Sequence, residues 1–156
     1  MTLLFALFLS AQMAPACAAA QLSGTFKEVP GSPGAGNIVY ELRLKNVSRA
    51  HCHVTGIPGV TLLDRRGKKL PTHARPANPG ALTAVLVDLA PGATATATAR
   101  FSPDVPGPGE TTTGRCEPVA YRLRVTPNGG GTLQAPISPP TSVCEHGGMS
   151  WSVLTR

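Results

Sequence analysis

Aromatic and charged residues are both scarce in this sequence. Phe, Tyr and Trp together supply 4% of the 156 residues, and Asp, Glu, Lys and Arg supply 14%. Such widely spaced rings do not form the stacking platform on which proteins bind single-stranded nucleic acid, so no nucleic acid partner is expected. The apolar fraction of 42% is ordinary for a globular protein, so the low charge does not indicate disorder.

The sequence also lacks long apolar runs and the short motifs of common enzymes. The apolar stretch 3–9 is far shorter than the roughly 20 residues that span a bilayer. No G-x-S-x-G, P-loop, dinucleotide-binding or H-E-x-x-H motif occurs, and none of the 8 carboxylates forms a motif-like pair. We therefore expect no transmembrane segment, no cofactor and no enzymatic activity, and a hydrolytic enzyme is the less favoured alternative.

Residues 1–16 predict a secretory signal peptide. Their apolar run is followed by Ala14-Pro15-Ala16, which has the A-x-A pattern of a signal-peptidase site. No Lys or Arg precedes the run, so the positive charge comes from the amino terminus or from residues further upstream. We expect residues 17–156 to form a single exported domain. The alternative is an ordinary buried N-terminal strand.

Short alternating segments separated by glycine and proline predict an all-β fold. The 17 Gly and 16 Pro residues lie in the connections, which favours many short strands and no convincing helix. Period-two alternation is clearest in 38–45 and 93–101. We expect seven to nine strands, within 22–26, 38–45, 60–63, 69–72, 82–89, 93–101, 119–125, 133–137 and 150–154. This spacing predicts an immunoglobulin-like β-sandwich, although Trp151 follows all four cysteines, unlike the tryptophan of antibody domains.

Four cysteines in a small exported chain predict two disulfides. Cys17 precedes the first strand and Cys52 follows the second, so an antiparallel hairpin would bring them together. Cys116 and Cys144 flank a later hairpin in the same way. Of the three pairings that four cysteines allow, we therefore predict Cys17–Cys52 and Cys116–Cys144, each contributing about 3–4 kcal/mol in the chain-entropy model.

Cys17 has a second interpretation. A cysteine directly after a signal peptide can be lipidated and anchor the chain at the cell membrane. The segment Ala14-Pro15-Ala16-Cys17 lacks the aliphatic residue that a lipobox places three positions before the cysteine. Lipidation would also leave an odd number of cysteines in an oxidising compartment. We expect a secreted protein, with lipid anchoring through Cys17 as the alternative.

Two histidines, His51 and His53, flank Cys52. In an extended segment both project away from the face that carries Cys52, side by side with each other. Two such histidines can chelate a metal, but a site needs further ligands, here His73 or His146. We expect Cys52 to be a disulfide partner, the histidines to lie on the surface, and no metal to be bound.

The formal net charge of +6 is mostly dispersed, with one cluster at Arg65, Arg66, Lys68 and Lys69. Gly67 lets this segment turn tightly, because glycine adopts positive φ freely. A basic exported protein can contact an anionic cell-wall polymer or an envelope protein, although a solvated hairpin tip explains the cluster equally well. We take the four side chains as the candidate contact turn of a non-enzymatic, envelope-associated or extracellular binding module. The alternative is a structural or accessory module without a ligand of its own.

Several motifs occur together in a characteristic order. They are Leu44-Lys45-Asn46-Val47-Ser48, Cys52, Gly56-Ile57-Pro58-Gly59-Val60, Leu89-Ala90-Pro91-Gly92, Cys116 and Cys144. This order resembles the domain of unknown function 4232 family, whose members are exported, many of them as actinobacterial lipoproteins. The resemblance covers nearly all of the mature chain and implies an exported β-sandwich. It implies no activity, because the family has no assigned chemistry, and the poor lipobox departs from its lipoprotein members.

Overall fold

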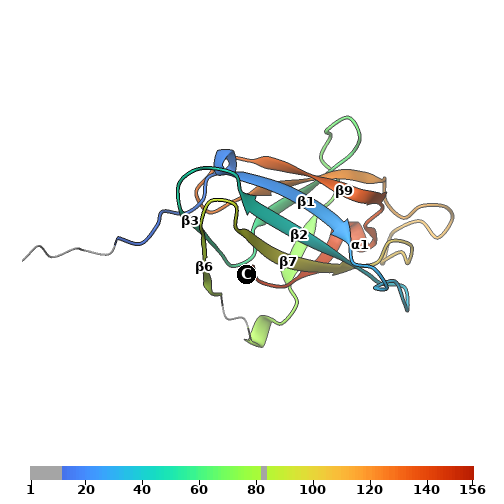
Figure 1. Cartoon of the computed structure of the whole chain (residues 1–156). Coiled ribbons are helices and arrows are strands. Elements are labelled where there is room, and N and C mark those ends of the chain that lie inside the picture. Colours follow the sequence, from blue (N-terminus) through green and yellow to red (C-terminus); the bar gives the residue numbers. More distant parts are fainter. Residues whose placement is uncertain (1–11, 82–83) are drawn as a thin grey trace, which may run out of the picture.

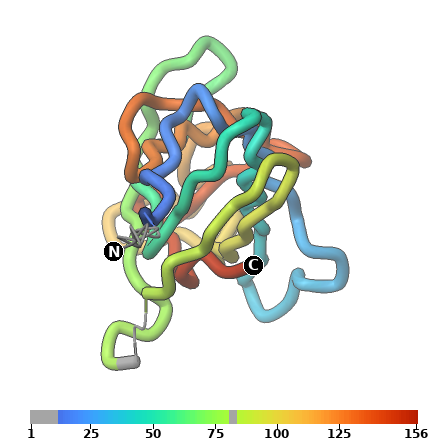
Figure 2. The backbone as a smooth tube through the Cα atoms, turned by 60° about the vertical axis from the view of Figure 1, so that its left-hand side comes forward, coloured from blue at the N-terminus to red at the C-terminus, as the bar shows by residue number. Residues whose placement is uncertain are grey.

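A computed structural model describes residues 12–81 and 84–156, and these residues form an almost entirely β structure (Figure 1). Figure 2 follows the path of the backbone from a second direction. Its strands are β1 (Leu22–Glu28), β2 (Ile38–Asn46), β3 (Cys52–Thr55), β4 (Gly59–Leu63), β5 (His73–Pro76), β6 (Leu86–Leu89), β7 (Thr94–Phe101), β8 (Ala120–Thr126), β9 (Leu133–Thr141) and β10 (Gly148–Trp151). Short helical turns are η1 (Ala19–Gln21), η2 (Pro79–Ala81) and α1 (Cys144–Gly147). The predicted all-β class is confirmed.

Eight of these strands form one curled sheet in the order β4-β8-β9-β1-β2-β7-β10-β5. Figure 1 shows β9, β1, β2 and β7 side by side in this order. The pairs β1–β9 and β10–β5 are parallel and the other pairs are antiparallel. Beyond the β4 edge, the Leu70 N–H donates to the Leu62 carbonyl at 2.9 Å, in the segment that leads into β5. The two edges of the sheet therefore approach each other, and the sandwich is barrel-like.

The inner faces of the strands enclose one hydrophobic core. Along β2 and β7, large and small side chains are paired across the sheet: Tyr40 with Ala99, Leu42 with Ala97, and Leu44 with Ala95. The small β7 alanines leave room for the large β2 side chains, which satisfies the close packing that protein interiors require. Alternating Ala and Thr therefore form a strand here in spite of the helix propensity of alanine.

Four of the aromatic residues lie together in this core. The ring centroids of Phe26 and Tyr40 are 5.1 Å apart, those of Tyr40 and Phe101 are 5.2 Å apart, and Phe26 stacks on Trp151 at 5.6 Å. All four are buried. Aromatic pairs at these separations stabilise by about 0.5–1.5 kcal/mol beyond the area that they bury.

Several predicted segments differ from the structure. The strand expected over 69–72 is reduced to a bridge between Leu63 and Lys69, and β5 follows it where no strand was predicted. All four β5 residues are exposed, so this strand has no apolar alternation for sequence reasoning to detect. The strand expected over 82–89 is described only from residue 84, and β6 begins at Leu86. The strand β3 was not predicted, and β10 begins earlier than the segment 150–154.

Both predicted disulfides are confirmed. Cys17 is bonded to Cys52 with the Cα atoms 4.8 Å apart, and Cys116 is bonded to Cys144 with the Cα atoms 5.5 Å apart. Two disulfides indicate that the chain matures in an oxidising compartment. No helix in the described parts of the chain is long and apolar enough to cross a membrane.

The predicted signal peptide lies mostly outside the described residues, and only its last part, 12–16, belongs to them. This part runs beside β3 as an extended chain. The His53 N–H donates to the Pro15 carbonyl at 2.9 Å, and the Cys17 N–H donates to the His53 carbonyl at 2.8 Å. Cleavage after Ala16 remains a prediction.

Candidate functional site

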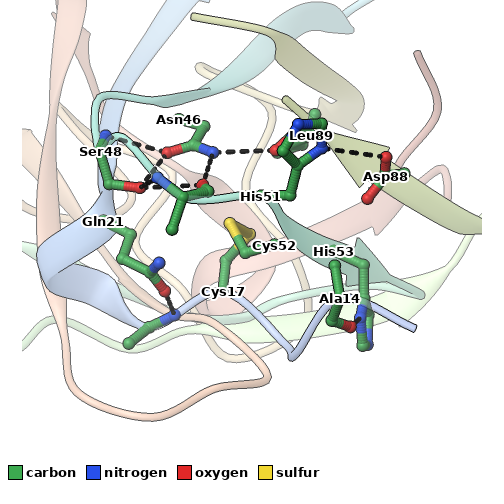
Figure 3. Close-up of a disulfide and its surroundings, with 12 residues drawn as sticks. Ala14, Cys17, Gln21, Asn46, Ser48, His51, Cys52, His53, Asp88 and Leu89 are labelled. Atoms are coloured by element: carbon green, nitrogen blue, oxygen red, sulfur yellow. Dashed lines mark hydrogen bonds and ion pairs between the residues drawn. A yellow bond between two sulfur atoms is a disulfide. The ribbon is translucent and has the colours of Figure 1, made fainter. Parts of the chain in front are cut away.

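A hydrogen-bonded network of neutral groups lies beside the Cys17–Cys52 disulfide (Figure 3). Asn46 is completely buried, and its Nδ2 donates to the carbonyls of Ala50 and Leu89, both at 2.8 Å. Its Oδ1 accepts the Ser48 N–H at 2.9 Å and the Ser48 hydroxyl at 2.7 Å. Because a buried amide must have its polar atoms satisfied, Asn46 fixes the turn that leads into Cys52. This end of the molecule is scaffold.

The two histidines beside Cys52 have separate partners in the structure. Nδ1 of His51 lies 3.6 Å from an Asp88 carboxylate oxygen and its side chain is 60% exposed, whereas Nδ1 of His53 lies 2.6 Å from the Ala14 carbonyl oxygen (Figure 3). The metal-ligand groupings found among the described residues contain neither of them, nor His73. Of the four histidines, only His146 lies in such a grouping.

The predicted contact turn is closed by hydrogen bonds to the Asp64 side chain. Oδ1 of Asp64 accepts the backbone N–H groups of Arg66 and Lys68, both at 2.8 Å. Gly67 has a φ of 83°, a conformation that glycine adopts without steric cost. These bonds close the turn and leave its basic side chains exposed.

Arg65 is held against β8. Its guanidinium carbon lies 4.7 Å from the centre of the Tyr121 ring, and its Nη2 donates to the Tyr121 hydroxyl at 3.1 Å. Nη2 of Arg122 donates to the Arg65 carbonyl at 2.7 Å. A cation over an aromatic face is stabilised by the ring quadrupole. Arg65 is therefore held in place next to the surface of β8.

An open depression of about 640 Å³ adjoins the turn, and we call it the basic depression. Three arginines line it, Arg65, Arg66 and Arg115, together with Tyr121 and the carboxylates of Asp64 and Glu117. The predicted contact residues Lys68 and Lys69 are not part of its lining. Sequence reasoning missed Arg115, which lies far along the chain from the turn. The one sequence feature that points to Arg115 is its position next to Cys116, which the disulfide with Cys144 fixes in space.

A second grouping joins Glu110, Glu117 and His146, and we call it the Glu-Glu-His cluster. The Glu110 side chain is 2% exposed, and its oxygens accept the backbone N–H groups of His146 at 2.6 Å, Gly107 at 2.7 Å and Glu145 at 2.8 Å. Burial alone would raise the pKa of Glu110, but the three N–H donors outweigh it and lower the pKa to about 2. Glu110 is therefore a carboxylate at neutral pH.

Both other members of the cluster have raised pKa values. Nε2 of His146 lies 3.0 Å from the Pro108 carbonyl oxygen, and this bond is the main reason that the pKa of His146 is raised, followed by the two carboxylates. Burial is the main cause of the raised pKa of Glu117, followed by its interaction with Glu110. The cluster concentrates negative charge around the histidine ring.

The Cys116–Cys144 disulfide explains why these distant residues meet. Glu117 follows one half-cystine and His146 is two residues beyond the other. Glu145 and His146 adopt φ values of 56° and 55°, so the segment α1 is a left-handed turn rather than a regular helix. Sequence reasoning missed the roles of Glu110 and Glu117, because a carboxylate pair without a motif has no local signature.

The fold and its two cross-links define a small disulfide-bonded all-β domain. A protein-family model described as domain of unknown function (DUF4232) matches residues 17–153, and the chain belongs to this family. No curated protein and no solved structure matches the chain significantly.

Proposed function

We propose that this chain is an exported, non-enzymatic binding module that attaches to an anionic polymer of the cell envelope through the basic depression. The observation that carries the proposal is the convergence of Arg65, Arg66 and Arg115 on one open surface. Guanidinium groups suit phosphate and carboxylate ligands, because their planar donors match two oxygens at once.

The neighbouring carboxylates are consistent with this role. Oδ1 of Asp64 is used by the turn itself, where it accepts two backbone N–H groups. Glu117 faces the Glu-Glu-His cluster, where its Oε1 lies 3.5 Å from Nδ1 of His146. Three arginines against two carboxylates leave the lining of the depression with a net positive charge, and an open, basic surface suits a chain-like ligand.

Export is the second part of the proposal. It is supported by the disulfides, which need an oxidising compartment, and by the A-x-A pattern before Cys17. Intact mass of the protein isolated from its host tests it. We expect a chain that begins at Cys17, carries no lipid and does not react with a thiol alkylating reagent. A mass that includes residues 1–16, or an added lipid, contradicts this part of the proposal.

Binding is tested with two soluble probes, inorganic polyphosphate and polyglutamate. The double variant Arg66→Gln/Arg115→Gln should weaken polyphosphate binding at least tenfold at low salt, and the affinity of the wild type should fall steeply as salt is added. The matched control is Lys27→Gln/Arg100→Gln, which removes the same charge from exposed positions on β1 and β7. Equal losses in both double variants would show that only net charge matters and would overturn the assigned site.

A further inference from the structure

We propose that the Glu-Glu-His cluster binds one zinc ion per chain, through Nδ1 of His146 and one oxygen from each of Glu110 and Glu117. Nδ1 lies 3.5 Å from Oε1 of Glu117 and 3.8 Å from Oε1 of Glu110. The three ligand atoms all lie within 4.8 Å of one another. This inference does not depend on the polymer-binding proposal.

The tautomer of His146 is set by a backbone carbonyl. Nε2 faces the Pro108 carbonyl oxygen at 3.0 Å, and a carbonyl oxygen can only accept, so Nε2 carries the hydrogen. In the neutral ring, Nδ1 then presents a lone pair toward Glu110 and Glu117. A histidine that donates its second ring nitrogen to a carbonyl is the usual arrangement around metal-bound imidazole, because that bond fixes the ring orientation.

With Nδ1 unprotonated and both carboxylates ionised, the lone pair and the carboxylates repel one another unless a cation lies between them. A proton on Nδ1 is one such cation, but N–H···O bonds are normally about 2.7–3.2 Å long, shorter than both distances in the cluster. In tetrahedral zinc sites, bonds of roughly 2.1 Å place the ligand atoms about 3.4 Å apart. Separations of 3.5 and 3.8 Å are therefore closer to the spacing around a metal ion than to a hydrogen bond.

The carboxylates are able to act as ligands although both are held by the protein. Each carboxylate oxygen has two lone pairs, and Oε1 of Glu110 uses one of them to accept the His146 N–H. The Glu117 side chain is only 14% exposed, so its carboxylate is largely removed from water. Ligands that are already oriented and desolvated lose little conformational entropy when they bind a metal.

Zinc is favoured among the common divalent ions. One imidazole and two carboxylates are a donor set that zinc accepts, whereas calcium and magnesium prefer oxygen ligands alone. Three protein ligands leave one tetrahedral position, and the His146 side chain is exposed at this edge. Solvent can fill the fourth position.

The test is a calorimetric titration of the chelator-treated full chain with zinc chloride. We expect one zinc per chain, and a loss of affinity of at least tenfold in His146→Gln and in Glu117→Gln. The control His51→Gln removes a histidine that faces a carboxylate elsewhere on the surface, and it should bind zinc like the wild type. Glu110 is not substituted, because its carboxylate also accepts the backbone N–H groups of Gly107, Glu145 and His146 and so holds two segments of the backbone in place.

A second readout guards against variants that change the fold. Tetrahedral Co²⁺ absorbs strongly in the visible range, so cobalt should colour the wild type and the His51→Gln variant but not His146→Gln. Disulfide mapping of His146→Gln should show the native pairs. No stoichiometric zinc in the wild type, equal affinity in His146→Gln, or zinc lost on His51→Gln would each overturn the assignment.

Discussion

The two disulfides hold regions of opposite character. Around Cys17–Cys52, the buried partners are backbone carbonyls and the neutral side chain of Asn46 with its neighbour Ser48, and the His51–Asp88 pair is exposed at the surface. Around Cys116–Cys144 lie Glu110, Glu117 and His146, with Arg115 adjacent. Similar cross-links thus serve different purposes in one domain. The first completes a packed scaffold, and the second brings charged side chains from distant segments together.

Removing each cross-link in turn tests this contrast most strongly. The cysteines are 35 and 28 residues apart in sequence, so both bonds should contribute about 4 kcal/mol through the entropy of the unfolded chain. We expect Cys17→Ala/Cys52→Ala and Cys116→Ala/Cys144→Ala to lose similar free energies of unfolding in urea. Only the second double variant should also lose zinc and polyphosphate binding. Loss of binding in the first, at temperatures where it is folded, would contradict the division.

Replacing Asn46 with alanine should destabilise the scaffold without affecting the binding surfaces. The change leaves the buried Leu89 carbonyl without its side-chain donor and removes both bonds to Ser48. We expect a loss of about 2–3 kcal/mol in the free energy of unfolding, with zinc affinity unchanged. Urea denaturation and calorimetry measure the two quantities. A loss of less than about 0.5 kcal/mol in the free energy of unfolding would show that the Asn46 network contributes little to stability.

Tyr40 gives the scaffold a pH dependence of its own. Burial, and secondarily Glu28, raise the pKa of this phenol from 10 to about 12, and its hydroxyl donates to the Pro139 carbonyl at 2.8 Å. The unfolded chain loses the proton near pH 10 and the folded chain retains it, so this contribution to stability is complete below pH 10 and is lost as the pH rises toward 12. Tyr40→Phe should be about 1 kcal/mol less stable at pH 7.

Measurements at alkaline pH separate the two effects of Tyr40→Phe, the loss of the hydrogen bond to Pro139 and the loss of an ionisable group. Between pH 10 and 12, the stability of Tyr40→Phe should decline less steeply than that of the wild type, so the two curves converge. Short incubations before each urea measurement keep the disulfides intact. Parallel curves would mean that Tyr40 ionises in the folded chain as easily as in the unfolded chain.

The smallest effect is expected for the exposed charges of the scaffold. Nη1 of Arg43 and Oε1 of Glu41 are 3.1 Å apart, but the arginine side chain is 55% exposed, so solvent screens the pair. Arg43→Gln should change the free energy of unfolding by no more than about 0.5 kcal/mol and leave zinc affinity unchanged. A larger loss in the free energy of unfolding would show that the Arg43–Glu41 pair stabilises the fold.

The same contrast explains what the sequence could and could not predict. The strands that carry the core alternate visibly, as in Ala95, Ala97 and Ala99, and the order of cysteines and hairpins was enough to pair all four half-cystines. The exposed β5 has no apolar pattern, and β3 is too short to show one.

The binding surfaces were only half predictable. The basic turn is a local feature, so Arg65 and Arg66 were found, whereas Arg115, Glu110 and Glu117 reach their sites through tertiary contacts. The histidines around Cys52 are neighbours in sequence, yet the structure gives them separate partners, Asp88 for His51 and the Ala14 carbonyl for His53. Charged side chains that meet through a disulfide can be recognised only after the pairing is known.

Trp151, stacked on Phe26 in the interior, is the single tryptophan of the chain. Its indole emission therefore arises from one completely enclosed position and will shift to longer wavelength when water reaches the β1–β10 interior. Fluorescence thus monitors collapse or opening of the core alone, without any attached dye. Metal titrations that leave this spectrum unchanged will have left the buried surroundings of Trp151 undisturbed.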